Sequence, residues 1–377
     1  MKNNMPSVPE SDSAFSFERT KRLKGMLILG VFIFHFCNFF PTEVRPDIGH
    51  TMVGAFFMLS GFGLLESFKR KKNYLDGFVG KKTARLLVPV WIAGIIVLIV
   101  NWTVYNNHLV LTENAYLYDV ISGGVTTTGT WFVVELIILY LFFYLAFKYL
   151  KMKWAIVAVS LATFLLMVIL SPQKYGMWYA SGMMFPVGLI ISYWKDKIES
   201  FVPHLILAIS IIVSIILALS MENLRMTSFS NLLFGNLQCL FVSLFIMASL
   251  LTRKTGFKIW ILTLLLCNVA YFLLGTMLQL GPNLITAMPV ITALLIPAGT
   301  DIISPLTNFF GNISYEFYII HVTMLYVSRI WFTEMLSCFM SSLIPALIMA
   351  IIINKVAKVF IGDKKKDASL KSGRLLE

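Results

Sequence analysis

The chain has 377 residues, of which 58% are hydrophobic and only 13% are charged. A soluble domain carries about 25% charged residues because water must solvate its surface, so this composition argues against ordinary soluble domains. The sequence also has no phosphate-cradling glycine loop, which argues against a soluble-type ATPase.

Long runs of Leu, Ile, Phe and Val follow one another along the chain. About 20 such residues cross the hydrocarbon core as a helix, and the alternation typical of membrane β-strands is missing from the sequence. The sequence therefore predicts an all-α, polytopic membrane helix bundle with ten to twelve transmembrane helices. In chain order they are expected at residues 23–41, 49–68, 84–105, 130–149, 153–171, 177–194, 203–220, 230–251, 257–279, 283–299, 311–332 and 337–358.

The charge distribution orients this bundle. Of the 31 Lys and Arg residues, 27 fall in loops on one side. Because cytoplasmic loops carry such an excess, both termini are predicted to be cytoplasmic, in a plasma (inner) membrane protein. Topology also explains the net charge of +12 without a nucleic-acid partner.

Three segments are expected from this topology. Residues 1–18 are predicted to form a cytoplasmic tail, residues 19–360 a single transmembrane domain, and residues 361–377 a basic cytoplasmic tail. The first apolar run has no small-x-small cleavage pattern, so it is interpreted as a retained helix rather than a signal peptide.

The longest predicted outer connection runs from Asn101 to Thr130 and contains no Lys or Arg. Long connections in compact folds are often functional, so it could cover an external binding site. It could equally be an inert connector.

The four cysteines lie far apart in apolar stretches. Their spacing fits neither a disulfide framework nor a zinc site, so no metal is predicted and small buried side chains are expected. They are Cys37, Cys239, Cys267 and Cys338.

His35 is the first ionisable residue deep in a predicted span, where such residues are costly and become functional candidates. It follows Lys24 by eleven residues, which is about 16 Å along a helix. One interpretation is a packing histidine satisfied by a neighbouring helix. The other is an acid–base group in the outer half of the bilayer, above the cytoplasmic cations Arg22 and Lys24, which suits a cytosolic anionic donor.

The second predicted span contains Ser60 within the small-residue segment 54–63. Small residues let helices approach closely, so the segment is typical of a packing motif. Alternatively, the Ser60 hydroxyl lines a cavity.

Lys82 and Arg85 open the third span and lie three residues apart, on one helix face. Topology accounts for most of the seven cations between Lys69 and Arg85. Because arginine binds phosphate bidentately, this pair could also hold a nucleotide-like diphosphate.

Glu135 lies one helical turn after Trp131, in the fourth span, and is expected to face the bundle interior. Trp131 fits the aromatic belt at the membrane interface.

In the eleventh span, Ser314, Tyr318 and His321 have i, i+4, i+7 spacing and share a face, with Glu316 beside them. This polar stripe either joins helices or contributes to catalysis.

Taken in order, these motifs resemble the acyltransferase-3 family of membrane acyltransferases, over about Arg19 to Phe360. They are Lys24-Gly25 with ten residues before His35, Phe56-Phe57-Met58-Leu59-Ser60-Gly61-Phe62, Lys82-x-x-Arg85 near Pro89, Trp131-Phe132, and Ile313-Ser314-Tyr315 leading to Tyr318 and His321.

The resemblance implies transfer of an acyl group, commonly acetyl, from cytosolic acyl-CoA to a hydroxyl of an extracytoplasmic or lipid-linked glycan. Acetyl-CoA is then a co-substrate rather than a permanently bound cofactor, and the expected partners are membrane lipid, acyl-CoA and the glycan. Lys24 and Lys82 stand where the family more often has arginine, which keeps the charge but loses the bidentate fork.

The predicted site follows from these motifs. His35 is expected to act as general base on the acceptor hydroxyl, oriented by Glu135 or Glu316. A covalent acyl-histidine is the competing route. The donor phosphates are assigned to Arg22, Lys24, Lys82 and Arg85, and substrate-facing or structural polar roles to Ser60, Trp131, Ser314, Tyr318, Glu316 and His321.

Two other classes of function stay open. In a transporter or flippase, four intramembrane residues would form a proton relay. In a scaffold, none of them would be needed for chemistry. The relay residues would be His35, Glu135, Glu316 and His321.

Overall fold

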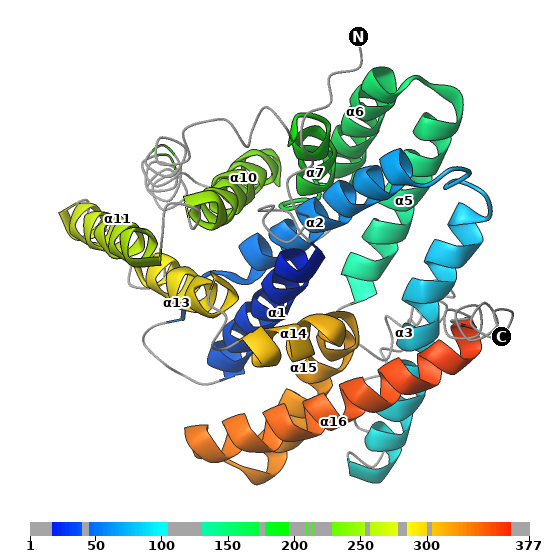
Figure 1. Cartoon of the computed structure of the whole chain (residues 1–377). Helices are drawn as coiled ribbons and strands as arrows, with labels where there is room; N and C mark the ends of the chain where they lie inside the picture. Colours follow the sequence, from blue (N-terminus) through cyan, green and yellow to red (C-terminus); the bar gives the residue numbers. More distant parts are fainter. Residues whose placement is uncertain are drawn as a thin grey trace, which may run out of the picture. The chain divides into compact units, whose positions relative to one another are not determined.

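The structure, a computed structural model, describes residues 17–39, 45–104, 130–172, 178–195, 209, 213, 228–252, 257–277, 285–299 and 304–362 (Figure 1). Within these ranges the secondary structure is entirely helical, which confirms the predicted all-α class. In chain order the helices are α1 (Phe17–Phe39), α2 (Gly49–Arg70), α3 (Phe78–Val104), α5 (Thr130–Tyr149), α6 (Met152–Leu170), α7 (Met184–Tyr193), α10 (Ser228–Thr252), α11 (Phe257–Met277), α13 (Ala287–Gly299), α14 (Ser304–Asn312), α15 (Ser314–Trp331) and α16 (Met335–Ile361).

Seven of the described helices are long and apolar enough to cross a membrane. They lie within α1, α2, α3, α5, α6, α11 and α16, and three shorter apolar segments lie in α7, α10 and α13. Eleven of the twelve expected spans thus coincide with described helices, and the one at residues 203–220 lies largely outside the described residues.

The expected helix at 177–194 is shorter than predicted, because α7 begins only at Met184. The Asn236 side chain of α10 forms hydrogen bonds with the turn before α7, where a helix would form backbone hydrogen bonds. The Asn236 amide oxygen accepts from the Met183 N–H at 3.0 Å, and its nitrogen donates to the Tyr179 carbonyl at 2.7 Å. A sequence pattern contains no sign of this partner, 53 residues away.

The expected span at 311–332 is interrupted by a bend at Ile313, which separates α14 from α15. Gly311 lies against α1 so closely that an added Cβ would collide with the Lys21 carbonyl. After the bend, the Ser314 hydroxyl donates to the Gly311 carbonyl at 3.3 Å. Tertiary packing rather than a helix-breaking proline thus ends the short helix.

The described chain forms two compact units. Unit 1 contains Met1–Asp76 and Leu141–Ser314, and unit 2 contains Gly77–Tyr140 and Tyr315–Glu377. The prediction of one transmembrane domain over residues 19–360 is not tested by this division.

In unit 1, α2 packs against α1, α7 and α10, and α1 also contacts α13 and α14 (Figure 1). Helices α2 and α7 approach each other closely where glycines from both helices meet. A Cβ at Gly61 would collide with the Phe185 carbonyl, and one at Gly188 with the Met58 carbonyl. Small residues therefore bring the two backbones into contact, as in many membrane helix pairs.

In unit 2, α16 packs against α3, and two polar contacts join α15 to these helices. The Tyr315 hydroxyl donates to the Leu86 carbonyl at 2.6 Å, and the Asn354 amide donates to the Glu316 carboxylate at 2.8 Å. Both contacts lie between apolar helices of unit 2, where a polar group without a partner is costly.

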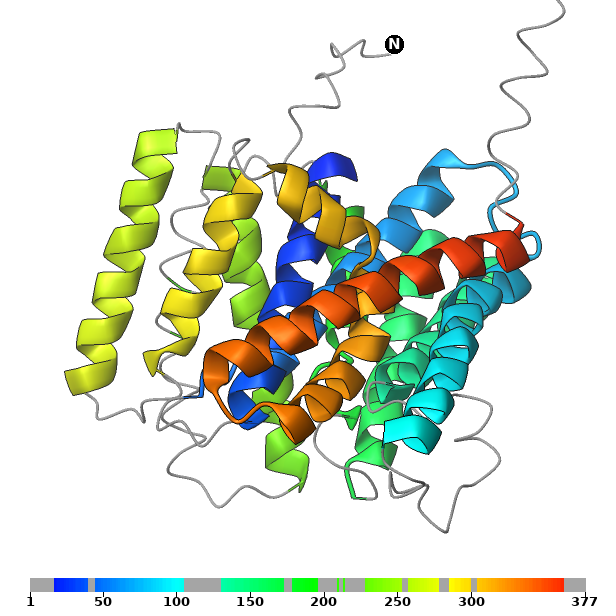
Figure 2. The same cartoon turned by 90° about the horizontal axis from the view of Figure 1, so that it is seen from below.

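Several helices of unit 1 expose wide apolar faces that water would not solvate. Figure 2 shows α11 and α13 side by side, and α11 exposes one large apolar side chain after another. These are Ile259, Leu262, Leu265, Leu266, Val269, Phe272 and Leu273. Surfaces of this size on a soluble monomer would be unusual, so lipid is the medium that covers them.

Candidate active site

Helix α1 carries the predicted base and the first predicted phosphate ligand on one face. His35 follows Lys24 by eleven residues, which is about three helical turns, so the two side chains point in nearly the same direction. Both residues are half-buried. The structure therefore supports a cation and an imidazole aligned along one side of α1, about 16 Å apart.

Both ends of α1 are fixed by close contacts within unit 1. Near Lys24, a Cβ at Gly25 would collide with the Thr307 carbonyl of α14. Near His35, a Cβ at Gly49 would lie 2.5 Å from the Phe34 ring. The helix is thus held on either side of the segment that carries both functional candidates.

Ser60 lies on α2, one residue before the glycine crossing with α7, and is half-buried. Gly49 of α2 packs against Phe34 of α1, so the start of α2 lies at the same height in the bundle as His35. Ser60 lies eleven residues further along α2, about 16 Å from that level. Its predicted role near the substrate therefore fits the level of Lys24 better than that of the imidazole.

Lys82 and Arg85 differ in their surroundings although they lie one turn apart at the start of α3. Lys82 is half-buried, and its ammonium group lies 5.7 Å from the Phe78 ring centroid and 5.8 Å from that of Tyr140. Two aromatic faces stabilise a cation there. Arg85 is exposed. The two cations therefore differ: Lys82 is held by aromatic rings, and Arg85 is exposed.

Glu135 is fully buried on α5, and neither carboxylate oxygen has a hydrogen-bonding partner in the described part of the chain. Tyr318 of α15 lies nearby, since its ring is 5.2 Å from that of Phe132, one turn before Glu135. A buried carboxylate without a partner costs stability, so this position is typical of a functional residue. Trp131, beside Phe132, is half-buried at the start of the same helix.

The three residues of the predicted stripe on α15 are buried: Ser314 is 7% exposed, Tyr318 7% and His321 1%. The His321 Nδ1 atom lies 3.0 Å from the Phe317 carbonyl and 2.8 Å from the Tyr318 carbonyl. Because carbonyl oxygens only accept, Nδ1 carries the proton and Nε2 is the basic nitrogen of the neutral ring. Glu316, in contrast, accepts from Asn354 and has a structural partner.

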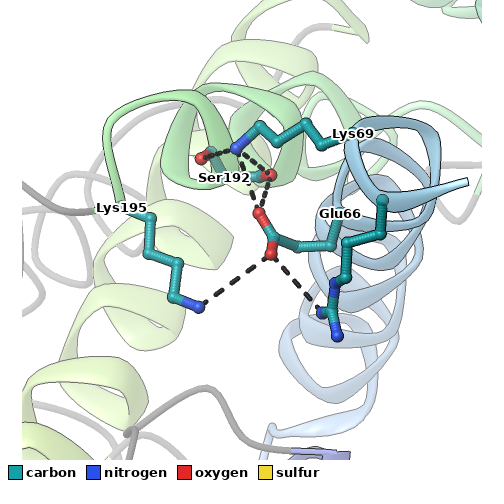
Figure 3. A network of polar contacts seen from close by, with 5 residues as sticks. Glu66, Lys69, Ser192 and Lys195 are labelled. Carbon is teal, nitrogen blue, oxygen red and sulfur yellow. Dashed lines mark hydrogen bonds and ion pairs between the residues drawn. The ribbon is translucent and has the colours of Figure 1, made fainter. Parts of the chain in front are cut away.

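Glu66 lies near the end of α2, far from the start of α2 that packs beside His35 of α1. It belongs to a polar network that joins α2 to α7 (Figure 3). Its carboxylate accepts from the Ser192 hydroxyl at 2.7 Å and from Lys69 at 3.0 Å, and Lys195 lies 3.9 Å away. Lys69 also donates to the Ser192 carbonyl. These contacts satisfy the carboxylate, so Glu66 fixes helices rather than acting on a substrate.

The two predicted catalytic residues belong to different units: His35 to unit 1 and Glu135 to unit 2. Their joint action therefore stays a prediction. Sequence reasoning missed the neutral amides Asn354 and Gln238, which bind Glu316 and His50. Neutral amides inside apolar runs carry no charge signal, and their partners lie 38 and 188 residues away.

The long apolar helices and their exposed apolar faces define a multi-pass helical membrane protein. The model of one protein family, described as an acyltransferase domain (Acyl_transf_3), matches residues 21–355. Because this match spans most of the chain, the chain belongs to the acyltransferase-3 family and is a membrane acyltransferase. No curated protein and no solved structure matches the chain.

Proposed function

We propose that the protein transfers an acyl group, represented by acetyl, from cytosolic acyl-CoA to a hydroxyl of an extracytoplasmic or lipid-linked glycan. The observation that carries the proposal is the alignment of Lys24 and His35 on one face of α1, about three turns apart. Lys24 lies toward the end of α1 that the charge distribution assigns to the cytoplasm, and His35 toward the opposite end.

In this proposal, Arg22 and Lys24 bind donor phosphates at the cytoplasmic end of α1. Lys82 and Arg85 are predicted phosphate ligands at the start of α3. The charge distribution assigns this end of α3 to the cytoplasm as well. Lysine binds phosphate as a point charge without the bidentate fork of arginine, so Lys24 and Lys82 keep the charge that this role needs.

The chemical step uses His35 as general base. The imidazole takes the proton of the acceptor hydroxyl, and the hydroxyl oxygen attacks the thioester carbonyl. The new C–O bond forms as the C–S bond breaks, and the departing CoA thiolate takes the proton from the imidazolium. A positioned base of this kind contributes about 10²–10⁴-fold in rate.

The test uses purified protein in nanodiscs, radiolabelled acetyl-CoA, and envelope glycan from cells that lack the gene product. His35→Ala should lower acetyl transfer about 10²-fold or more, because water replaces the positioned base. Asn38→Ala, an exposed polar position one turn further along α1, is the matched control and should keep wild-type transfer.

Near wild-type transfer by His35→Ala would exclude the base assignment. Absence of CoA binding by the wild-type protein would instead favour a transporter or flippase, which has no need of this donor. Mass spectrometry of envelope glycans with and without the gene product should show the loss of one acyl mass per site.

A further inference from the structure

A polar cluster of unit 1 lies at the same end of the helices as His35 and was not expected from the sequence. Asp47 lies two residues before α2, His50 lies in the first turn of α2, and Gln238 lies on α10. The His50 Nε2–H donates to the Gln238 amide oxygen at 2.9 Å, and His50 Nδ1 lies 3.7 Å from the Asp47 carboxylate.

The cluster adjoins the predicted base through neighbouring residues. Gly49, directly before His50, packs against the ring of Phe34, directly before His35. The cluster therefore lies at the level where the proposed base meets its acceptor, on the side that charge assigns to the exterior.

The cluster is accessible and has unused hydrogen-bonding capacity. The Asp47 side chain is 43% exposed and that of His50 is 21% exposed. Gln238 accepts from His50 through its amide oxygen, and among the described residues its amide nitrogen makes no hydrogen bond. The neighbouring His50 lowers the pKa of Asp47, so this carboxylate is ionised at neutral pH and accepts hydrogen bonds.

A buried hydroxyl nearby also lacks a protein partner. Cys239 contacts the carbonyls of both His50 and Ala180, which places the turn before α7 beside the cluster. Ser181, next to Ala180, is 1% exposed, and its hydroxyl has no partner among the described residues. A buried hydroxyl in this state is explained by a ligand or water that completes its hydrogen bonding.

We propose that Asp47 and Gln238, held by His50 between them, bind hydroxyl groups of the glycan acceptor and hold one of them beside His35; this inference rests on the proposed function. The Asp47 carboxylate accepts hydrogen bonds from sugar hydroxyls, and the Gln238 amide nitrogen donates to them, so together they match the donor and acceptor groups of a glycan. A few fixed polar groups of this kind set ligand orientation in a binding site.

The experiment measures KM for the same purified envelope glycan and for acetyl-CoA. Gln238→Met removes the amide while keeping length and should raise the glycan KM about 3–10-fold, as expected for one neutral hydrogen bond. Asp47→Asn should raise it by about tenfold or more, because hydrogen bonds to a charged group are stronger. KM for acetyl-CoA should stay constant in both variants.

Asn268→Leu is the control, since it removes another side-chain amide from an apolar helix, where it donates to Thr292 between α11 and α13. It should leave the glycan KM unchanged. Asp47 is half-exposed, so Asp47→Asn carries the test if Gln238→Met does not fold, as judged by size exclusion.

An unchanged glycan KM in both variants, with normal wild-type transfer, overturns the acceptor site and leaves the proposed function standing. A lower kcat with an unchanged glycan KM also overturns the acceptor site, because Asp47 and Gln238 then do not contribute to glycan binding. No transfer by the wild-type protein overturns the proposed function and this inference with it.

Discussion

Replacing Gly61 by alanine perturbs the close contact between α2 and α7 in unit 1. The added Cβ would collide with the Phe185 carbonyl of α7, and a backbone oxygen has no rotamer by which it could move away. The helices must therefore separate, which weakens the packing of α2 against α7. Gly63, two residues further along α2, has open space around its added Cβ and provides a matched control.

The expected size follows from two opposing effects. Alanine is favoured over glycine in a helix by about 1 kcal/mol, and this gain applies at both positions. Overpacking costs about 1–3 kcal/mol and applies at Gly61 alone. The difference between the two variants thus isolates the collision, and Gly61→Ala should be less stable than Gly63→Ala by about 1–3 kcal/mol.

Thermal unfolding of both purified variants in the same detergent measures this difference. At about 2 °C per kcal/mol for a large domain, Gly61→Ala should melt about 2–6 °C below Gly63→Ala. Equal melting temperatures would refute the close approach of α2 and α7. So would a lower melting temperature for Gly63→Ala.

Two further substitutions test residues of unit 2: one tests function and stability, and the other tests stability alone. Glu135→Gln should raise the melting temperature, because the buried carboxylate has no partner among the described residues. The same substitution should lower acetyl transfer about 10²-fold. If stability and transfer both fell, Glu135 would have a structural role instead. Tyr315→Phe removes a 2.6 Å hydrogen bond to the Leu86 carbonyl, and should cost about 0.6 kcal/mol, as is usual between membrane helices. A melting temperature lowered by more than that of Gly61→Ala would contradict this estimate.

The predicted site divides into residues whose surroundings support a functional role and residues with structural partners. Glu135 is buried without a partner, whereas Glu316 is bound by Asn354. The sequence offered both carboxylates as candidates to orient His35. Glu135 keeps its hydrogen-bonding capacity, whereas a carboxylate already held by an amide has less capacity for another task. Which of the two orients His35 stays a prediction.

The sequence by itself determined the helical membrane class, most helix positions and the alignment of Lys24 with His35. These depend on apolar run length and on the fixed rise and turn of a helix, which are local properties. It also determined the family, because the motifs keep their order along the chain.

Only the tertiary structure decided where helices end and which polar groups meet. Asn236 replaces the first helical turn before α7, and the contact of Gly311 with α1 precedes the bend at Ile313. Gln238 reaches His50 across 188 residues. Such partners come from distant segments, and neutral side chains reveal nothing about them until packing brings them together.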